Sequence, residues 1–303
     1  MPAFLRQCFI LLCFWAVSLC VVGGPARAQG IELIDDSGRA VVLKAPAQRV
    51  VTLSSQVTEI AFAAGAGNKI VATVNSSDFP AEALKLPRIG ESLQPDYNKI
   101  ASYRPDLIIS QLSTQVDPLE ELNVPLFISA PESLAEIADS VETFGALLGT
   151  SNIARPRADL LRQTIDMLIH TNASRSAQQR PVRVFIQAGP EPDLTLSGDH
   201  LLSDVIDLCG GLNVFAQEYS LTPKISPSEV IAAKPDIVLV GRSGAGSAPV
   251  ADPQALAYWK SVGLPAARNG QVFMMEADVL FRPGPRLIEA AGSLCAAIDR
   301  AHQ

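Results

Sequence analysis

The sequence predicts an α/β protein of two lobes, each built on a doubly wound parallel sheet, with one long helix between them. Three observations lead to this prediction. Short apolar runs rich in β-branched residues alternate with segments of helical periodicity, which is typical of parallel sheets covered by helices. The alternation occurs twice along the chain. A single long helical pattern separates the two series.

The first 28 residues precede this pattern and are predicted to be a secretory signal. Arg6 provides a short positive region, residues 8–22 form an uncharged apolar run, and Ala26 and Ala28 are small residues at the positions that a signal peptidase reads. Cleavage is expected before Gln29. The alternative is a membrane anchor, but the run is shorter than the ~20 residues that a spanning helix needs.

The N-terminal lobe is expected over residues 29–150. Its predicted strands are short and almost continuously apolar, which suits strands buried on both faces. The strands are placed at residues 49–53, 69–74, 106–110 and 125–129, and the helices at 56–64, 96–102 and 134–148.

The C-terminal lobe is expected over residues 181–303 and repeats the same pattern. The strands are placed at residues 182–187, 236–240 and 271–275, and the helices at 201–208, 226–233, 253–261 and 286–300. Residues 100–109 and 230–239 are nearly a literal repeat, because in both a helix stops before a proline and an aspartate leads into a strand. This repeat indicates that the two lobes have similar folds.

The segment 151–180 is predicted to connect the lobes as a helix followed by a polar linker. Leu160, Leu161, Ile165, Leu168 and Ile169 fall on one stripe at helical spacing. The helix is expected over residues 153–171, with a proline at 156 in its first turn, where proline is tolerated. Two lobes joined in this way can enclose a ligand between them.

Composition argues against several classes of function. With 31 acidic and 24 basic residues the net charge is −7, and it becomes −9 when Arg6 and Arg27 leave with the signal, whereas a nucleic-acid binder needs a basic face. The chain has three histidines and neither an H-E-x-x-H nor a C-x-x-C motif, so no metal site is predicted. No pairing of a nucleophile with a base emerges, and an enzyme is therefore not favoured.

Cysteine usage points to an oxidising compartment. Five cysteines are present, and three of them lie within residues 1–28. Cleavage leaves Cys209 and Cys295 as a candidate disulfide. Two buried free thiols remain the alternative, since spacing alone does not establish proximity.

Several segments together resemble a known family, the periplasmic substrate-binding proteins of the iron-siderophore, haem and cobalamin importers. The segments that carry the resemblance are residues 31–39, 49–54, 58–65, 77–80 and 86–90 in the first half, and 185–189, 207–215 and 281–286 in the second. The second half is most similar to the cobalamin (vitamin B12) receptors. The resemblance implies a class III periplasmic binding protein: two Rossmann-like lobes joined by one long backbone helix.

The resemblance also implies a function. We expect a monomeric periplasmic protein that captures cobalamin or a related corrinoid and delivers it to an inner-membrane ABC permease, with the corrinoid as transported ligand and no cofactor. The resemblance places a disulfide at Cys209 and Cys295. The alternatives are a ferric siderophore or haem on the same scaffold, and, from another class, a secreted α/β enzyme.

Most of the expected binding residues lie in predicted loops at the carboxyl ends of the strands, where ligands bind in such sheets, and one of these loops is residues 278–282. Tyr219 is added as an aromatic ring that can contact the ligand. The full set is Ser54, Ser55, Ser76, Asp78, Phe79, Ser92, Gly189, Tyr219, Arg242, Asp278, Phe281 and Arg282. Ser76 and Ser92 stand where the cobalamin receptors have aromatic rings. The family docks on its permease through one glutamate on each lobe. Asn98 and Ser228 occupy those positions here. The neighbouring Asp96 and Glu229 are candidates to substitute for the glutamates, and the alternative is that each is a helix-start carboxylate favoured by the helix dipole.

Overall fold

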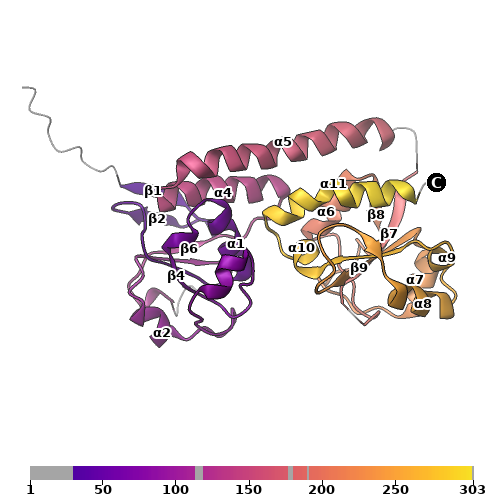
Figure 1. The fold of residues 1–303 in the computed structure, drawn as a ribbon, viewed down its shortest axis with the longest axis horizontal. Helices are drawn as coiled ribbons and strands as arrows, with labels where there is room; N and C mark the ends of the chain where they lie inside the picture. The colour runs from indigo at the N-terminus through magenta and orange to yellow at the C-terminus, as the bar shows by residue number, and fades with distance from the viewer. Residues whose placement is uncertain (1–29, 113–118, 177–179, 190, 302–303) are drawn as a thin grey trace, which may run out of the picture.

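The structure is a computed structural model that describes residues 30–112, 119–176, 180–189 and 191–301. Two α/β lobes lie side by side along one long helix, α5 (Ser151–Ser176) (Figure 1). Each lobe holds its own sheet of mainly parallel strands. The predicted fold class, two Rossmann-like lobes with a connecting backbone helix, is therefore confirmed. The expected signal, residues 1–28, lies outside the described residues.

The N-terminal lobe is built on a four-stranded parallel sheet in the order β4-β3-β5-β6. The strands are β3 (Val50–Thr52), β4 (Ile70–Thr73), β5 (Leu107–Ser110) and β6 (Leu126–Ile128). Nearly all their side chains are buried, which explains the continuous apolar runs. The other elements are β1 (Ile31–Ile34), β2 (Ala40–Leu43), α1 (Ser55–Ala63), η1 (Gly67–Lys69), η2 (Ala81–Lys85), α2 (Tyr97–Ser102) and α4 (Leu134–Leu148).

The C-terminal lobe contains a five-stranded sheet in the order β10-β11-β9-β7-β8, in which only β10 runs antiparallel to its neighbour. Its strands are β7 (Val182–Gln187), β8 (Gly211–Asn213), β9 (Ile237–Arg242), β10 (Val250–Ala251) and β11 (Val272–Glu276). Its helices are α6 (Leu201–Leu208), α7 (Pro227–Ala233), α8 (Pro253–Ser261), α9 (Pro265–Arg268), α10 (Ala277–Phe281) and α11 (Pro285–Arg300). The short elements β8, β10, α9 and α10 were not predicted, because they are too brief to show a period.

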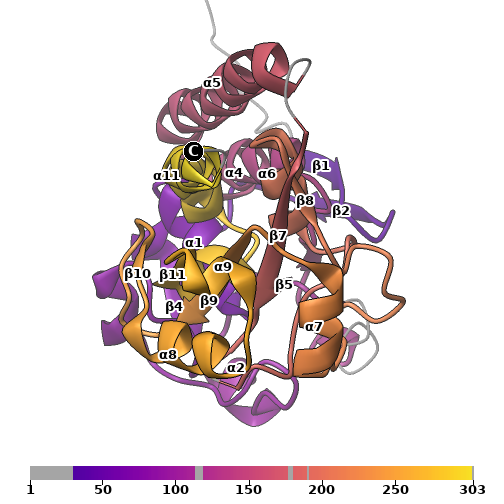
Figure 2. The ribbon, with the colours of Figure 1, turned by 90° about the vertical axis from the view of Figure 1, so that its right-hand side faces the viewer.

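Helix α5 is longer than predicted and buries a narrower stripe. It begins at Ser151, so Pro156 lies inside the helix rather than in its first turn. Leu161 is buried, but Leu160 and Ile169 are 51% and 42% exposed, so these two do not belong to the packed face. The helix packs on α4 and α11, and Figure 2 shows all three on the side of the molecule away from α2, α7 and α8.

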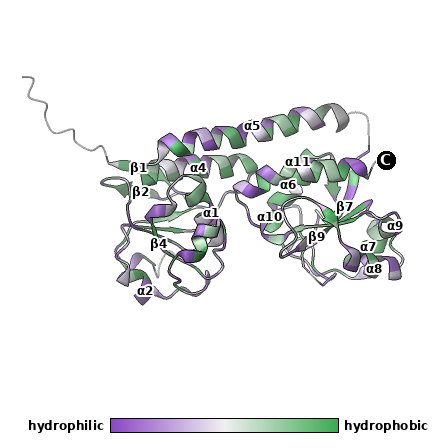
Figure 3. Cartoon of the chain, viewed as in Figure 1, coloured by the Kyte–Doolittle hydropathy of each residue, from purple (hydrophilic) through white to green (hydrophobic). Residues whose placement is uncertain are grey.

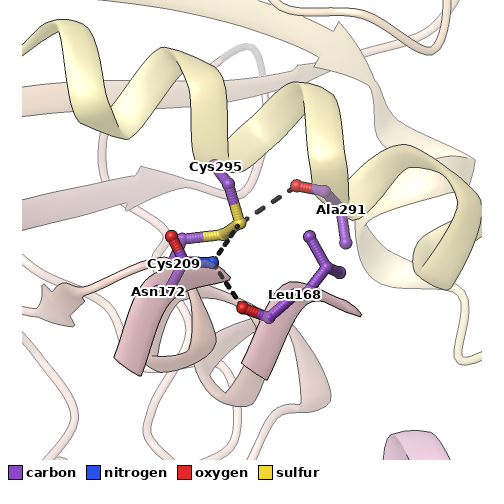
Figure 4. Close-up of a disulfide and its surroundings, with 5 residues drawn as sticks. All are labelled: Leu168, Asn172, Cys209, Ala291 and Cys295. Carbon is purple, nitrogen blue, oxygen red and sulfur yellow. Dashed lines mark hydrogen bonds between the residues drawn. A yellow bond between two sulfur atoms is a disulfide. The ribbon is translucent and has the colours of Figure 1, made fainter. Parts of the chain in front are cut away.

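The two cysteines form a disulfide, as predicted. Cys209 ends α6 and Cys295 lies on α11, with their Cα atoms 4.6 Å apart (Figure 4). The amide of Asn172, on α5, donates to the carbonyl of Leu168 at 2.8 Å and contacts Cys295 Sγ at 3.7 Å. The bridge therefore fastens the last helix to its own lobe next to the connecting helix.

The hydrophobic residues concentrate in the sheets and in the helix faces that cover them (Figure 3). One buried cluster extends through both lobes along α4, α11 and the inner part of α5, and each lobe has a further cluster on the other face of its sheet. Within the described residues, no helix combines the length and the apolar character needed to cross a bilayer.

Candidate ligand-binding cleft

A hollow of about 310 Å³ lies between the two lobes. The N-terminal lobe lines it with Ser55, Gln56, Ser76 and Gln111, and the C-terminal lobe with Ala277, Asp278, Phe281, Arg282 and Pro283. These residues follow the carboxyl ends of β3, β4, β5 and β11, where ligands bind in open parallel sheets. The hollow therefore brings together five of the expected binding residues.

A cluster of buried hydroxyl groups connects the elements of the N-terminal lobe that line the hollow. The hydroxyl cluster consists of Thr52, Thr58, Thr73 and Ser77, linked by oxygen–oxygen distances of 2.7–3.0 Å. It joins β3, α1, β4 and the loop after β4. Ser54 caps α1, because its hydroxyl accepts the backbone N–H of Val57 at 3.2 Å. Ser54 is thus a buried cap, and the adjacent Ser55 faces the hollow.

The C-terminal side is formed by helix α10 where the sequence predicted a loop. Asp278 lies in its first turn and Phe281 is its last residue. The ring of Phe281 lies against β9 so closely that a Cβ atom at Gly241 would be 2.1 Å from it, so this position requires glycine. His200 is centred 6.3 Å from the same ring, edge to face.

Arg282 links the two lobes through buried charge. It is only 9% exposed and lies 2.9 Å from Asp78, 3.0 Å from Asp278 and 3.7 Å from Glu59. Arg286 donates to Glu59 at 2.9 Å. We call these five residues the charge cluster. Three carboxylates face two guanidinium groups, so the cluster carries one net negative charge when all its groups are ionised.

The two aspartates of the charge cluster differ in their affinity for a proton. Burial raises the pKa of Asp78, but hydrogen bonds from Arg282 and Asp278 outweigh it and lower the pKa below its usual value. Burial also raises the pKa of Asp278, and although the charge of Arg282 opposes this, the neighbouring Asp78 adds to the rise. On acidification the first proton at this pair is therefore expected on Asp278.

Other expected binding residues lie away from this hollow. Arg242 forms an ion pair with Asp252, the buried cap of α8, so its charge is already compensated within its own lobe. Phe79 lies beneath Arg286, with its ring 3.9 Å from the guanidinium, and lines a separate hollow behind the charge cluster. Ser92 lies in the loop before α2 and does not line the hollow.

Gly189 and Tyr219 occupy loops of the C-terminal lobe. The Gly189 carbonyl accepts the side-chain amide of Gln187 at 2.9 Å. The Tyr219 side chain is fully exposed to solvent. The nearby Leu221 lines a second hollow between the lobes, of about 440 Å³, together with His200 and Glu132.

Sequence reasoning missed Gln56 and Glu59 as residues of the cleft. Both lie on α1 and are only 2% and 3% exposed. The available signal was an amide and a carboxylate in the first half of a nine-residue helix whose second half is apolar. That signal does not reveal which partner, if any, lies opposite.

The expected docking residues lie on α2 and α7, on the side of the molecule opposite α5 (Figure 1). Asp96 caps α2 by accepting the backbone N–H of Lys99 at 3.0 Å, and Asn98 is in the first turn. Glu229 and Ser226 form a capping box at the start of α7, and the Ser228 hydroxyl is 2.8 Å from that of Ser226. Both carboxylates therefore stabilise a helix start while remaining accessible from solvent.

Comparison with known proteins gives consistent matches over most of the chain. A family model described as periplasmic binding protein matches residues 50–279. The vitamin B12-binding protein of Vibrio cholerae serotype O1 is 32% identical over 254 residues, which cover 82% of this chain and 88% of that protein.

Solved structures of periplasmic binding proteins are also similar to this chain. The crystal structure of the periplasmic vitamin B12 binding protein of Vibrio cholerae is similar with a TM-score of 0.73 and 30% identity, covering 85% of this chain and 99% of that one. The periplasmic haem-binding protein from Roseiflexus sp. RS-1 has a TM-score of 0.67 and 25% identity, covering 84% and 99% of the two chains.

Proposed function

Because the chain belongs to the periplasmic binding protein family, which comprises solute-binding proteins and not enzymes, we propose that it captures cobalamin or a related corrinoid between its lobes. The bound corrinoid is then delivered to an ABC permease of the inner membrane. In this proposal the corrinoid is cargo and no cofactor takes part. The mature protein begins at Gln29 in the periplasm and acts as a monomer.

The chemistry of the hollow between the lobes carries the corrinoid proposal. Its N-terminal side offers uncharged hydroxyl and amide groups, from Ser55, Gln56, Ser76 and Gln111. A corrin has peripheral carboxamide arms, which such groups can bind through neutral hydrogen bonds. The similarity to proteins named for vitamin B12 supports the same ligand.

Anionic ligands fit this hollow less well. Arg282 is the single cation among the described residues that line it, and carboxylates already surround that guanidinium. A catecholate siderophore or the propionates of haem would need cations that are not already paired. Haem would also need an axial Tyr, His or Met, and the described lining of this hollow has none of these.

Docking on the permease is proposed to use Asp96 and Glu229. The two carboxylates lie on separate lobes and on the same side of the molecule, opposite α5 (Figure 1). A permease that contacts both could therefore sense the relative position of the lobes.

Isothermal titration of the mature chain with cyanocobalamin tests the ligand. We expect saturable heat with one site per chain. Parallel titrations with haem and with a ferric hydroxamate siderophore serve as comparisons, and haem binding would also appear as a Soret band. Absence of heat with cyanocobalamin at tens of micromolar protein, together with binding of either comparison ligand, would contradict the corrinoid assignment.

A further inference from the structure

We propose that the side chain of Gln56 recognises one primary carboxamide of the ligand at the floor of the hollow between the lobes. This proposal rests on the corrinoid function and adds a specific contact to it. Gln56 lies in the first turn of α1, next to Ser55, and lines the hollow together with groups from both lobes.

The amide of Gln56 is buried without a hydrogen-bonding partner. The residue is 2% exposed, and neither Oε1 nor Nε2 has a partner among the described residues. Buried amide groups are nearly always hydrogen-bonded, since an unmet donor or acceptor carries its full desolvation cost. Such a residue beside a hollow is explained if the ligand supplies the missing partners.

A second buried glutamine shows what this fold does when the side chain is structural. Gln187, at the end of β7, is also 2% exposed. Its Nε2 donates to the Gly189 carbonyl at 2.9 Å, and its Oε1 accepts the indole N–H of Trp259 at 2.9 Å. Both ends of Gln187 are bonded within the lobe, whereas neither end of the Gln56 amide has a partner among the described residues.

A primary carboxamide is the group that fits both ends of the Gln56 amide. It offers an oxygen acceptor and N–H donors, so the two amides can form a reciprocal pair. A carboxylate has acceptors only and would leave Gln56 Oε1 unmet. When all its groups are ionised, the charge cluster has one net negative charge, which also disfavours a carboxylate in this hollow. The hollow is lined from both lobes, so a ligand reaches Gln56 by entering between them.

Titration of Gln56→Met tests the contact. Methionine keeps the unbranched shape and removes both hydrogen-bonding groups. We expect cyanocobalamin to bind about tenfold more weakly, the order expected for two neutral hydrogen bonds lost. Gln163→Met, on the exposed side of α5, is the matched control and should bind as the wild type does. Gln56→Leu provides a second variant should the first fail to fold.

Cyanocobalamin derivatives with one side-chain amide hydrolysed to a carboxylate test the chemistry of recognition. The wild type is expected to bind at least one of these monoacids about tenfold more weakly than the parent, and Gln56→Met should lose that discrimination. If the wild type bound every monoacid as tightly as it binds cyanocobalamin itself, the carboxamide assignment would be overturned.

Thermal unfolding of the ligand-free proteins separates recognition from a structural role. Because the unpartnered amide is unfavourable in the free protein, Gln56→Met should unfold at an equal or higher temperature than the wild type, while binding is weakened. A lower unfolding temperature with unchanged binding would overturn the inference and leave the corrinoid function intact. Absence of cyanocobalamin binding by the wild type would overturn both.

Discussion

The two lobes repeat one hydrogen-bonding arrangement at the amino ends of their strands. In the N-terminal lobe, Asp106 accepts the backbone N–H of Arg49 at 2.8 Å, and the Arg49 guanidinium donates to carbonyls at the end of α2. In the C-terminal lobe, Asp236 accepts the backbone N–H of Arg183 at 2.8 Å, and Arg183 donates to carbonyls at the end of α7. The near-literal repeat in the sequence therefore encodes the same helix-to-strand connection twice.

The lobes differ at the carboxyl ends of the strands, near the hollow between the lobes. The N-terminal lobe places the hydroxyl cluster there, which holds α1 and the loop after β4. The C-terminal lobe instead places helix α10 there, and the ring of Phe281 at its end lies against Gly241 of β9. The amino ends thus carry the shared scaffold, and the carboxyl ends carry what is particular to each lobe.

The largest effect is expected from removal of the disulfide, which joins two residues of the C-terminal lobe. For a separation of 86 residues, the chain-entropy estimate is about 4–5 kcal/mol, and measured losses are usually about 2–4 kcal/mol. We expect Cys209→Ala/Cys295→Ala to lower the free energy of unfolding by that smaller amount. Urea unfolding followed by the fluorescence of Trp259, in the C-terminal lobe, measures it.

Reduction of the wild type by dithiothreitol is the companion experiment. Hydrogen exchange in β3 and β5 reports on the N-terminal lobe, which has no part in the bridge. If loss of the disulfide destabilised both lobes equally, the lobes would have to unfold as one unit.

A smaller effect is expected from replacing the two repeated aspartates, Asp106 and Asp236, one at a time. Asp106→Asn should cost about 1 kcal/mol, because an amide provides one acceptor where the carboxylate accepts two backbone N–H groups. Asp236→Asn is expected to cost more than Asp106→Asn only if the pair between Asp236 and Arg180, at 2.7 Å, adds to stability, because Arg180 is exposed to solvent. Urea unfolding at neutral pH measures both, with the exposed Asp166→Asn as control. Equal costs would mean that the Arg180 pair adds nothing to stability.

The smallest effect concerns pH and His200. Burial lowers the pKa of His200, against a backbone hydrogen bond at Phe281 that raises it. The unfolded chain therefore takes up a proton at a higher pH than the folded one, and stability falls as the pH drops through about 6.5 and below. His200→Asn keeps an acceptor for the Leu202 N–H and removes the titration.

The difference in unfolding temperature between the wild type and His200→Asn measures this contribution at pH 7.5 and pH 5. We expect the unfolding temperature of the variant to rise relative to that of the wild type as the pH falls. Carboxylates such as Asp78 titrate alike in both proteins, so the difference reports on His200. A constant difference across this range would show that His200 does not contribute.

Local patterns predicted the elements well where they are long or fully buried. Residues 134–148, 182–187 and 201–208 were placed at their observed bounds, because burial repeats with the period of a helix or fills a strand. The prediction was wrong at residues 278–281, where α10 replaces a loop, because five residues are too few to show a helical period. Arg242 was expected to face a ligand, but no sequence pattern reveals that Asp252 compensates it.

The sequence by itself determined the two lobes, the long helix and the repeated connection, since each appears as a local pattern of apolar, proline and aspartate residues along the chain. Tertiary structure alone decided the cleft. Arg282 and Asp78 are 204 residues apart, and Glu59 and Arg286 are 227 apart, so their pairing depends on how one lobe lies against the other. The same holds for Gln56, because whether a buried amide has a partner is fixed by the groups around it and not by its own helix.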